Sequence, residues 1–198
     1  MNLPNRLTVA RLVMVPLFVV LMSLDHVVAY GFAYVVFTTA SITDYLDGRI
    51  ARNRHMITSF GKLLDPLADK VLMASALVMV MEVPELDVPG WTIVAILARE
   101  FLVTGARSLA ASEGTIIAAS NTGKTKTVIQ MVYIYVFLFF AIVSRCIQAW
   151  APEFLDTFAP ILRGASLGGI VFVAGYTVYS GIDFARANWK TLNLGSQE

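Results

Sequence analysis

The sequence predicts an all-α polytopic membrane protein, and its composition, its apolar runs and the placement of its charges all favour that class. Of the 198 residues, 57% are hydrophobic and 15% are charged, whereas soluble domains are about 45–50% apolar and about 25% charged. The mean hydropathy is +0.70. A soluble globular protein and a disordered chain are therefore disfavoured. The 15 Lys and Arg against 14 Asp and Glu give no basic excess of the kind typical of nucleic-acid binding.

Six apolar runs are long enough to cross a bilayer, for which a helix needs about 20 residues. They cover residues 8–28, 29–48, 62–83, 90–111, 122–145 and 159–184. Because the connections between them are short, we expect one membrane domain over residues 1–198 and no separate soluble domain. Before the first run, Asn2 or Asn5 can cap a short helix that lies at the membrane interface, with Arg6 towards the headgroups.

Positive charges gather in alternate connections between these runs. They lie before or at the start of the first run, in the second and fourth connections and in the C-terminal tail: Arg6, Arg11, Arg49, Arg52, Arg54, Lys62, Arg107, Lys124, Lys126, Arg186 and Lys190. The other connections hold only Arg145, with Arg163 beyond it. Under the positive-inside rule this pattern places both termini in the cytoplasm, which six spans permit.

Four aspartates lie where the second apolar run ends and the third begins. Asp44 and Asp47 are three residues apart, and Asp65 and Asp69 are four apart, so each pair shares one helix face. The short polar connection predicts that the two helices are antiparallel neighbours, which would bring all four carboxylates together. Such a cluster requires cations at low dielectric, and two divalent ions such as Mg²⁺ or Mn²⁺ would balance it.

These acids could instead be helix-end residues that lipid headgroups solvate, and Asp65 followed by Pro66 is typical of a helix N-cap. One or two such residues would favour that interpretation. Four acids with helical spacing, flanked by Gly48 and Gly61, favour a metal site. Intramembrane carboxylates are costly, and a glycine lets a ligand approach the backbone closely.

The segment from Asp44 to Asp69 resembles the signature of CDP-alcohol phosphatidyltransferases, D-x2-D-G-x2-A-R-x8-G-x3-D-x3-D, with every fixed position present. The resemblance implies a six-helix enzyme, commonly a homodimer, that binds two divalent metal ions. Such enzymes move the phosphatidyl group of CDP-diacylglycerol to an alcohol and release CMP. For this chain the resemblance implies a multi-pass protein of the bacterial cytoplasmic (inner) membrane with a cytoplasmic active site.

The family motif also implies roles for individual residues. The implied metal ligands are Asp44, Asp47, Asp65 and Asp69, of which Asp69 is also the general base. The implied contacts with the CDP-lipid are Asn5, Thr8, Gly48, Arg52 and Thr58. These roles suit an in-line attack by an alcohol on a pyrophosphate. Two metals can stabilise the charge that develops, and a carboxylate can remove the hydroxyl proton.

A second basic cluster bears on the acceptor alcohol. Arg107, Lys124 and Lys126 could together hold a phosphate, although each could singly be a positive-inside charge. Arg99, which lies deeper, predicts a structural ion pair with its neighbour Glu100. Three stretches resemble bacterial family members that use sn-glycerol 3-phosphate and form phosphatidylglycerol phosphate: residues 3–8, 98–107 and 123–127. The resemblance therefore implies sn-glycerol 3-phosphate as the acceptor.

Other functions share parts of this pattern. An enzyme of the cardiolipin synthase type, or one that uses serine or an inositol phosphate, would have the same aspartates and the same chemistry. A divalent-cation membrane transporter could also gather carboxylates, but near the midplane of the membrane rather than at one face beside Arg52 and Lys62. A non-catalytic scaffold is disfavoured because all four aspartates are intact.

Overall fold

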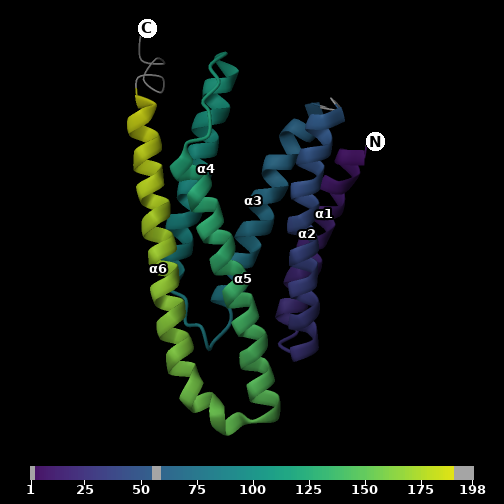
Figure 1. Cartoon of the computed structure of the whole chain (residues 1–198), viewed down its shortest axis with the longest axis vertical. Coiled ribbons are helices and arrows are strands. Elements are labelled where there is room, and N and C mark those ends of the chain that lie inside the picture. Colours follow the sequence, from purple (N-terminus) through teal and green to yellow (C-terminus); the bar gives the residue numbers. More distant parts are fainter. Residues whose placement is uncertain (1–2, 55–58, 190–198) are drawn as a thin grey trace.

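The computed structural model describes residues 3–54 and 59–189, and within them the side chains of residues 7–43 and 67–189. In these residues the chain forms six α-helices, a short 3-10 turn and no strand. The elements are α1 (Leu3–Ser23), α2 (Val27–Arg54), α3 (Ser59–Met81), α4 (Gly90–Ser112), α5 (Asn121–Trp150), η1 (Pro152–Phe154) and α6 (Leu155–Ala187) (Figure 1). The predicted all-α class is confirmed, and the helices follow the predicted apolar runs in number and order.

The first helix differs from the prediction of a separate helix at the membrane interface. α1 is unbroken, so the residues before the first apolar run form its opening turns. Pro4 falls in the first turn, where a missing N–H has no intrahelical partner to lose, and no glycine or further proline occurs before Pro16. The helix ends before Asp25, whose left-handed φ is 51°, and therefore earlier than the predicted end at residue 28.

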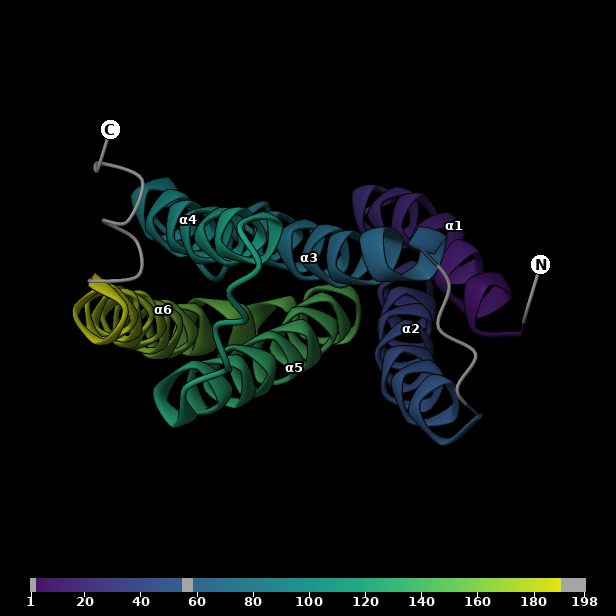
Figure 2. The same cartoon turned by 90° about the horizontal axis from the view of Figure 1, so that it is seen from above.

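α3 lies at the centre of the bundle and contacts α1, α2, α4 and α5. α1 and α2 pack together on one side of it, and α6 packs against both α4 and α5 on the other (Figure 2). Each of the six described helices contributes a fully buried apolar side chain to the interior: Phe18, Phe37, Leu72, Ile96, Ile134 and Ile170. This shared core fixes the helix ends relative to one another, as a site built from several helices requires.

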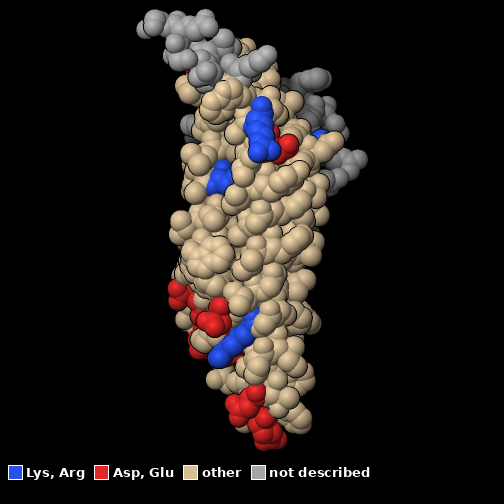
Figure 3. All heavy atoms as spheres, turned by 90° about the vertical axis from the view of Figure 1, so that its left-hand side faces the viewer, with Lys and Arg blue, Asp and Glu red and all other residues tan. Residues whose placement is uncertain are grey.

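The outer surface of the bundle is also apolar. Several large apolar side chains are more than half exposed, among them Val13, Phe32, Leu102 and Phe172. On the face drawn in Figure 3, charged groups lie towards the two ends, and the broad band between them carries no charge. An exposed apolar surface of this extent is typical of a protein in contact with lipid.

Two helical segments are long and apolar enough to cross a membrane, namely Asn121–Trp150 and Pro152–Ala187. The apolar parts of the first two helices, Leu7–Ser23 and Val27–Thr43, are shorter. Together with the apolar outer surface, these segments indicate a membrane protein.

The ends of the helices sort into two groups at opposite ends of the bundle. The C-terminal ends of α2, α4 and α6 lie at one end, which also holds the N-terminal ends of α1 and α3 (Figure 1). The turns from α1 to α2 and from α5 to α6 lie at the other end. The predicted alternation of the connections between the two ends is therefore present in the fold.

The contacts of Arg145 explain why a basic residue lies near the fifth connection, although the other basic residues gather in the even-numbered connections. It lies near the end of α5 and is buried, and its guanidinium donates to Glu85 at 3.0 Å and pairs with Asp25 at 2.6 Å. Glu85 precedes α4 and Asp25 precedes α2, so one cation ties two turns to α5. The charge at this position neutralises neighbouring carboxylates, and it does not conflict with the positive-inside pattern.

Changing Arg145 to Gln is expected to lower the free energy of unfolding by about 3–5 kcal/mol, because Glu85 would stay buried without a cation. Unfolding of the purified protein in detergent, followed by circular dichroism against temperature or denaturant, measures the change. The control is Arg163→Gln, because Arg163 is exposed on α6 and its loss should change the stability by about 0.5 kcal/mol or less. Equal effects of the two substitutions would show that the Arg145 cluster does not stabilise the fold.

Candidate active site

The aspartate motif spans the end of α2 and the beginning of α3. Asp44 and Asp47 lie within α2, and Asp65 and Asp69 lie within α3, so each pair has the helical backbone that its spacing requires. The two helices pack against each other, as predicted for antiparallel neighbours. Among these acids the structure describes only the Asp69 side chain, which is half-buried.

Several predicted site residues fall where the structure gives no side chain. The side chains of Asn5, Asp44, Asp47, Gly48, Arg52 and Asp65 lie outside the described residues, and so does Thr58 as a whole. Thr8, the remaining predicted contact of the CDP-lipid, is buried on α1. No group of three potential metal ligands occurs among the side chains that the structure describes, and the predicted metal site stays a prediction.

A polar cavity of about 210 Å³ lies beside Asp69. Its walls come from the middle of α3, the middle and second half of α4, and the first turns of α5 with Ala119 before them. Arg107, Lys124 and Lys126 all line it together with Asp69. The structure thus brings the predicted base to the same cavity as the three residues predicted to bind the acceptor phosphate.

The cavity has a strong excess of positive charge. Among the residues that the structure describes, its lining includes five cations and two carboxylates: Lys70, Arg99, Arg107, Lys124 and Lys126, with Asp69 and Glu100. Lys126 is buried, so water screens its charge little, whereas Lys124 is exposed. The arrangement favours a small anion that carries more than one negative charge.

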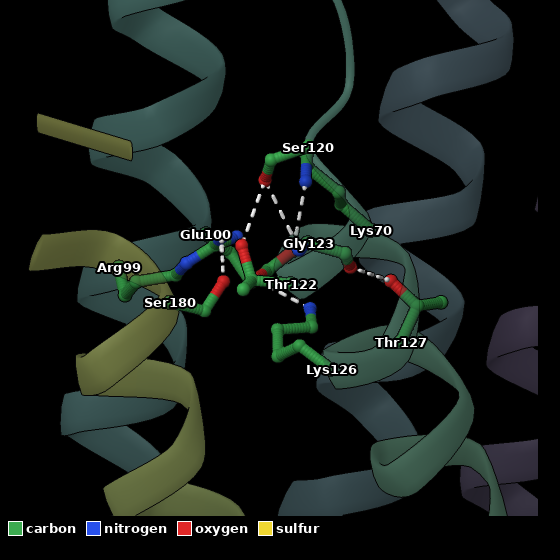
Figure 4. Close-up of polar contacts among 9 residues, drawn as sticks. All are labelled: Lys70, Arg99, Glu100, Ser120, Thr122, Gly123, Lys126, Thr127 and Ser180. Carbon is green, nitrogen blue, oxygen red and sulfur yellow. Dashed lines mark hydrogen bonds and ion pairs between the residues drawn. The ribbon is translucent and has the colours of Figure 1, made fainter. Parts of the chain in front are cut away.

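Glu100 is the centre of the ion pairs in this cavity (Figure 4). Its Oε1 accepts from Lys126 Nζ at 2.6 Å and from Arg99 Nη1 at 3.0 Å, and its Oε2 accepts from Lys70 Nζ at 3.1 Å. The predicted pair between Arg99 and Glu100 is confirmed, and two lysines from other helices join it. Lys126 is therefore held by a carboxylate and does not stand free in the cavity.

Arg107 and Lys124 are the cations of this cavity that lack a carboxylate partner within the described part of the chain. The guanidinium of Arg107 lies 5.3 Å from the centroid of the Phe184 ring, and its Nη2 donates to the Ala118 carbonyl at 3.4 Å. The ring and the carbonyl orient the planar group while leaving other donors for a ligand. A guanidinium in this state can grip two oxygens of one phosphate.

The first turn of α5 is fixed from two sides. Ser120 caps the helix by accepting from the Gly123 N–H at 3.1 Å. Thr122 Oγ1 donates to Asp183 of α6 at 2.6 Å. These contacts fix the part of α5 that carries Lys124, and they give Asp183 a structural role that its position in the sequence did not reveal.

Lys70 is the residue of this cavity that the sequence interpretation missed. It directly follows Asp69, the last aspartate of the motif, and that position was a signal that it would lie beside the site. Its ammonium pairs with Glu100 of α4. That contact joins two helices, and no spacing of residues within α3 predicts it.

Comparison with known proteins agrees with the motif. The family model described as CDP-alcohol phosphatidyltransferase matches residues 1–160. A Bacillus subtilis protein named CDP-diacylglycerol–glycerol-3-phosphate 3-phosphatidyltransferase is 34% identical over 208 residues, covering 98% of this chain and 99% of the relative. A protein of the same name from Rickettsia bellii is 42% identical over 130 residues, covering 66% of this chain and 71% of the relative.

A third relative, a probable phosphatidylglycerophosphate synthase from Mycobacterium tuberculosis, is 45% identical over 140 residues, with 69% of this chain and 66% of the relative covered. The similarity predicted from the sequence, to this family and to bacterial phosphatidylglycerophosphate synthases in particular, is confirmed.

Proposed function

Because the chain belongs to the CDP-alcohol phosphatidyltransferase family, we propose that it transfers the phosphatidyl group of CDP-diacylglycerol to sn-glycerol 3-phosphate. The products are phosphatidylglycerol phosphate and CMP. The observation that carries the choice of acceptor is the cation-lined cavity, in which Arg107, Lys124 and Lys126 lie with Asp69. The names of the relatives support the same acceptor.

The cavity has groups that can bind both the phosphate end and the hydroxyl end of sn-glycerol 3-phosphate. The phosphate end meets Arg107 and Lys124, which offer charged hydrogen bonds that no described carboxylate takes. The hydroxyl end then lies towards Asp69. As the hydroxyl oxygen bonds to the phosphorus of the phosphatidyl group, its proton passes to the Asp69 carboxylate. The bond between that phosphorus and the bridging oxygen breaks, and CMP leaves with the electron pair.

Divalent metal ions complete the proposed site, and the family is generally dependent on them. Asp44, Asp47, Asp65 and Asp69 would hold two such ions, Mg²⁺ or Mn²⁺, because their oxygen ligands suit hard cations. The packing of α2 against α3 and the half-buried carboxylate of Asp69 fit this assignment. When bound, the ions supply stabilisation for the charge on the transferred phosphate and on the leaving oxygen.

The donor site is assigned to the other residues that the family resemblance implies. We propose contacts with the CDP-lipid for Asn5, Thr8, Gly48, Arg52 and Thr58. Of these, the support for Thr8 is its burial on α1, which packs against α2 and α3.

The helix lengths support the membrane setting that we propose. The shortest helix has 21 residues, which at about 1.5 Å per residue is about 30 Å, the thickness of a bilayer core. We therefore assign six spans to a single domain in the bacterial cytoplasmic (inner) membrane, with both termini and the active site on the cytoplasmic side. A homodimer is part of the proposal because the family resemblance implies it.

The cation-lined cavity also bears on the alternative functions. A divalent-cation transporter has no need of a cavity lined by five cations, whereas a phosphorylated acceptor pairs with them. Serine carries no phosphate that would pair with Arg107 and Lys124. A cardiolipin synthase and an inositol phosphate enzyme also bind phosphorylated acceptors, and the assay below separates them.

We expect the purified protein to release CMP from labelled CDP-diacylglycerol when sn-glycerol 3-phosphate and Mg²⁺ or Mn²⁺ are present. The panel of acceptors should include glycerol, serine, an inositol phosphate and phosphatidylglycerol. Activity should be lost in EDTA and return with added metal. Preference for another acceptor would change the assigned substrate, and full turnover in EDTA would contradict the metal site.

Changing Asp69 to Asn keeps the size of the side chain but removes the base. Turnover should fall by roughly 10²–10⁴-fold, the usual contribution of general-base catalysis, or more if a metal is lost as well. Binding of CDP-diacylglycerol, measured separately, should persist. Asp156→Asn is the matched control because Asp156 is exposed at the beginning of α6, and near-normal turnover of Asp69→Asn would mean that another group is the base.

Changing Arg107 to Gln should raise the KM for sn-glycerol 3-phosphate by about 10- to 100-fold, since a hydrogen bond to a charged group is worth about 1.5–3 kcal/mol. The KM for CDP-diacylglycerol should change little. Titration of each substrate at saturating levels of the other measures both values. Arg186→Gln is the control, because Arg186 is exposed in the last turn of α6. A rise in KM for the lipid alone would remove Arg107 from the acceptor site.

A further inference from the structure

We propose that Glu100 is a positioning residue for the acceptor site, which fixes the ammonium groups of Lys126 and Lys70 at the wall of the cavity. This inference rests on the proposed function, because it assigns Glu100 a role in binding the acceptor phosphate. Glu100 itself need not touch the substrate. Its effect passes through the two lysines.

The first argument is that Glu100 joins cations from three helices. Lys70 comes from α3, Arg99 from α4 and Lys126 from α5, and each lies within 3.1 Å of a Glu100 carboxylate oxygen. Lysine side chains are long and flexible, so an ammonium without a fixed partner would sample many positions. One carboxylate between the helices gives both ammonium groups a defined place.

The second argument is burial. The Lys126 side chain is only 4% exposed, and a buried ammonium is costly unless a carboxylate pairs with it. The Lys126 ammonium has its closest partner in Glu100 Oε1 at 2.6 Å. Glu100 is therefore what allows a charged lysine to stand at the inner wall of this cavity.

The third argument is the sign of the charge. A carboxylate in a cavity that binds a phosphate repels the ligand, so positive potential alone would favour a neutral residue at this position. The structure nevertheless has a glutamate there, and its oxygens face the lysines. That placement favours a role in geometry over a role in the net charge.

The fourth argument is that Glu100 is held in place from behind. Arg99 donates to Glu100 and, through Nη2, to Ser180 Oγ of α6 at 2.7 Å (Figure 4). Gly181 gives the Arg99 stem its room, because a Cβ at that position would lie 2.9 Å from Arg99 Cγ. The chain of contacts from α6 through Arg99 fixes the carboxylate that in turn fixes the lysines.

The test is a pair of substitutions, Glu100→Gln and Glu100→Asp, with KM and kcat measured for each substrate. Positioning predicts that the KM for sn-glycerol 3-phosphate rises roughly tenfold in Glu100→Gln and by a smaller factor in Glu100→Asp. Small misplacements of binding groups have effects of this size or larger. The KM for CDP-diacylglycerol should stay near that of the unchanged protein.

A double-mutant cycle with Lys126→Gln tests whether Glu100 changes the KM through Lys126. If Glu100 acts through Lys126, the two substitutions together should raise the KM by less than the product of their separate factors. The matched control is Glu153→Gln, the same chemical change at an exposed glutamate of η1, which lies at the opposite end of the bundle. It should leave both KM values unchanged.

Three results would overturn the proposal. A lower KM for sn-glycerol 3-phosphate in Glu100→Gln, with an unchanged value in Glu100→Asp, would show that Glu100 acts only through its charge. Reduced stability with both KM values unchanged would show a structural role alone. Full additivity in the cycle would exclude Lys126 as the route. If the unchanged protein does not use sn-glycerol 3-phosphate, the proposed function fails instead, and the two failures are thereby distinguishable.

Discussion

Charge inside an apolar helical bundle has to be neutralised by groups that lie within reach, and this requirement shapes both ends of the molecule. At one end Arg145 is buried, and its guanidinium pairs with the carboxylates of both Asp25 and Glu85. At the other end the cavity beside Asp69 holds more described cations than carboxylates. The first arrangement stabilises the fold, and the second leaves charge that a ligand can neutralise.

This difference is possible because the helices are held by an apolar core that does not depend on the charged groups. Phe18, Phe37 and Leu72 lie in a continuous interior with their counterparts on the other helices. The ion pairs of Glu100 then add cross-links between helices whose relative positions are already fixed. An anionic ligand can therefore enter or leave the cavity without removing the contacts that hold the bundle together.

Much of the fold could be predicted from the sequence because the responsible features are local. Apolar runs of about 20 residues give the helices, and the alternation of Lys and Arg matches the sorting of the helix ends (Figure 1). The separate N-terminal helix was wrong for a local reason as well, because nothing between Pro4 and Pro16 interrupts the backbone. The role of Arg145 could not be predicted, since its partners lie 60 and 120 positions away in the sequence.

The candidate site also has features that the sequence predicts and contacts that it does not. The aspartate spacing and the basic cluster are visible as patterns on single helices, and the cavity joins Asp69 to all three predicted basic residues. The pairing of Lys70 and Lys126 with one glutamate depends on how α3, α4 and α5 pack, which no helical spacing encodes. Sequence reasoning could therefore name the cations that face the cavity but not distinguish those that Glu100 holds from those that are open to a ligand.

The proposed reaction explains why such a division would be useful. A lipid pyrophosphate and a phosphorylated acceptor repel each other, and both have to approach one carboxylate that must accept a proton. Fixing Lys70 and Lys126 on Glu100 at 3.1 and 2.6 Å keeps their positive potential beside the acceptor while directing their ammonium groups to another carboxylate. Arg107 and Lys124 are then the described cations through which a phosphate can bind directly.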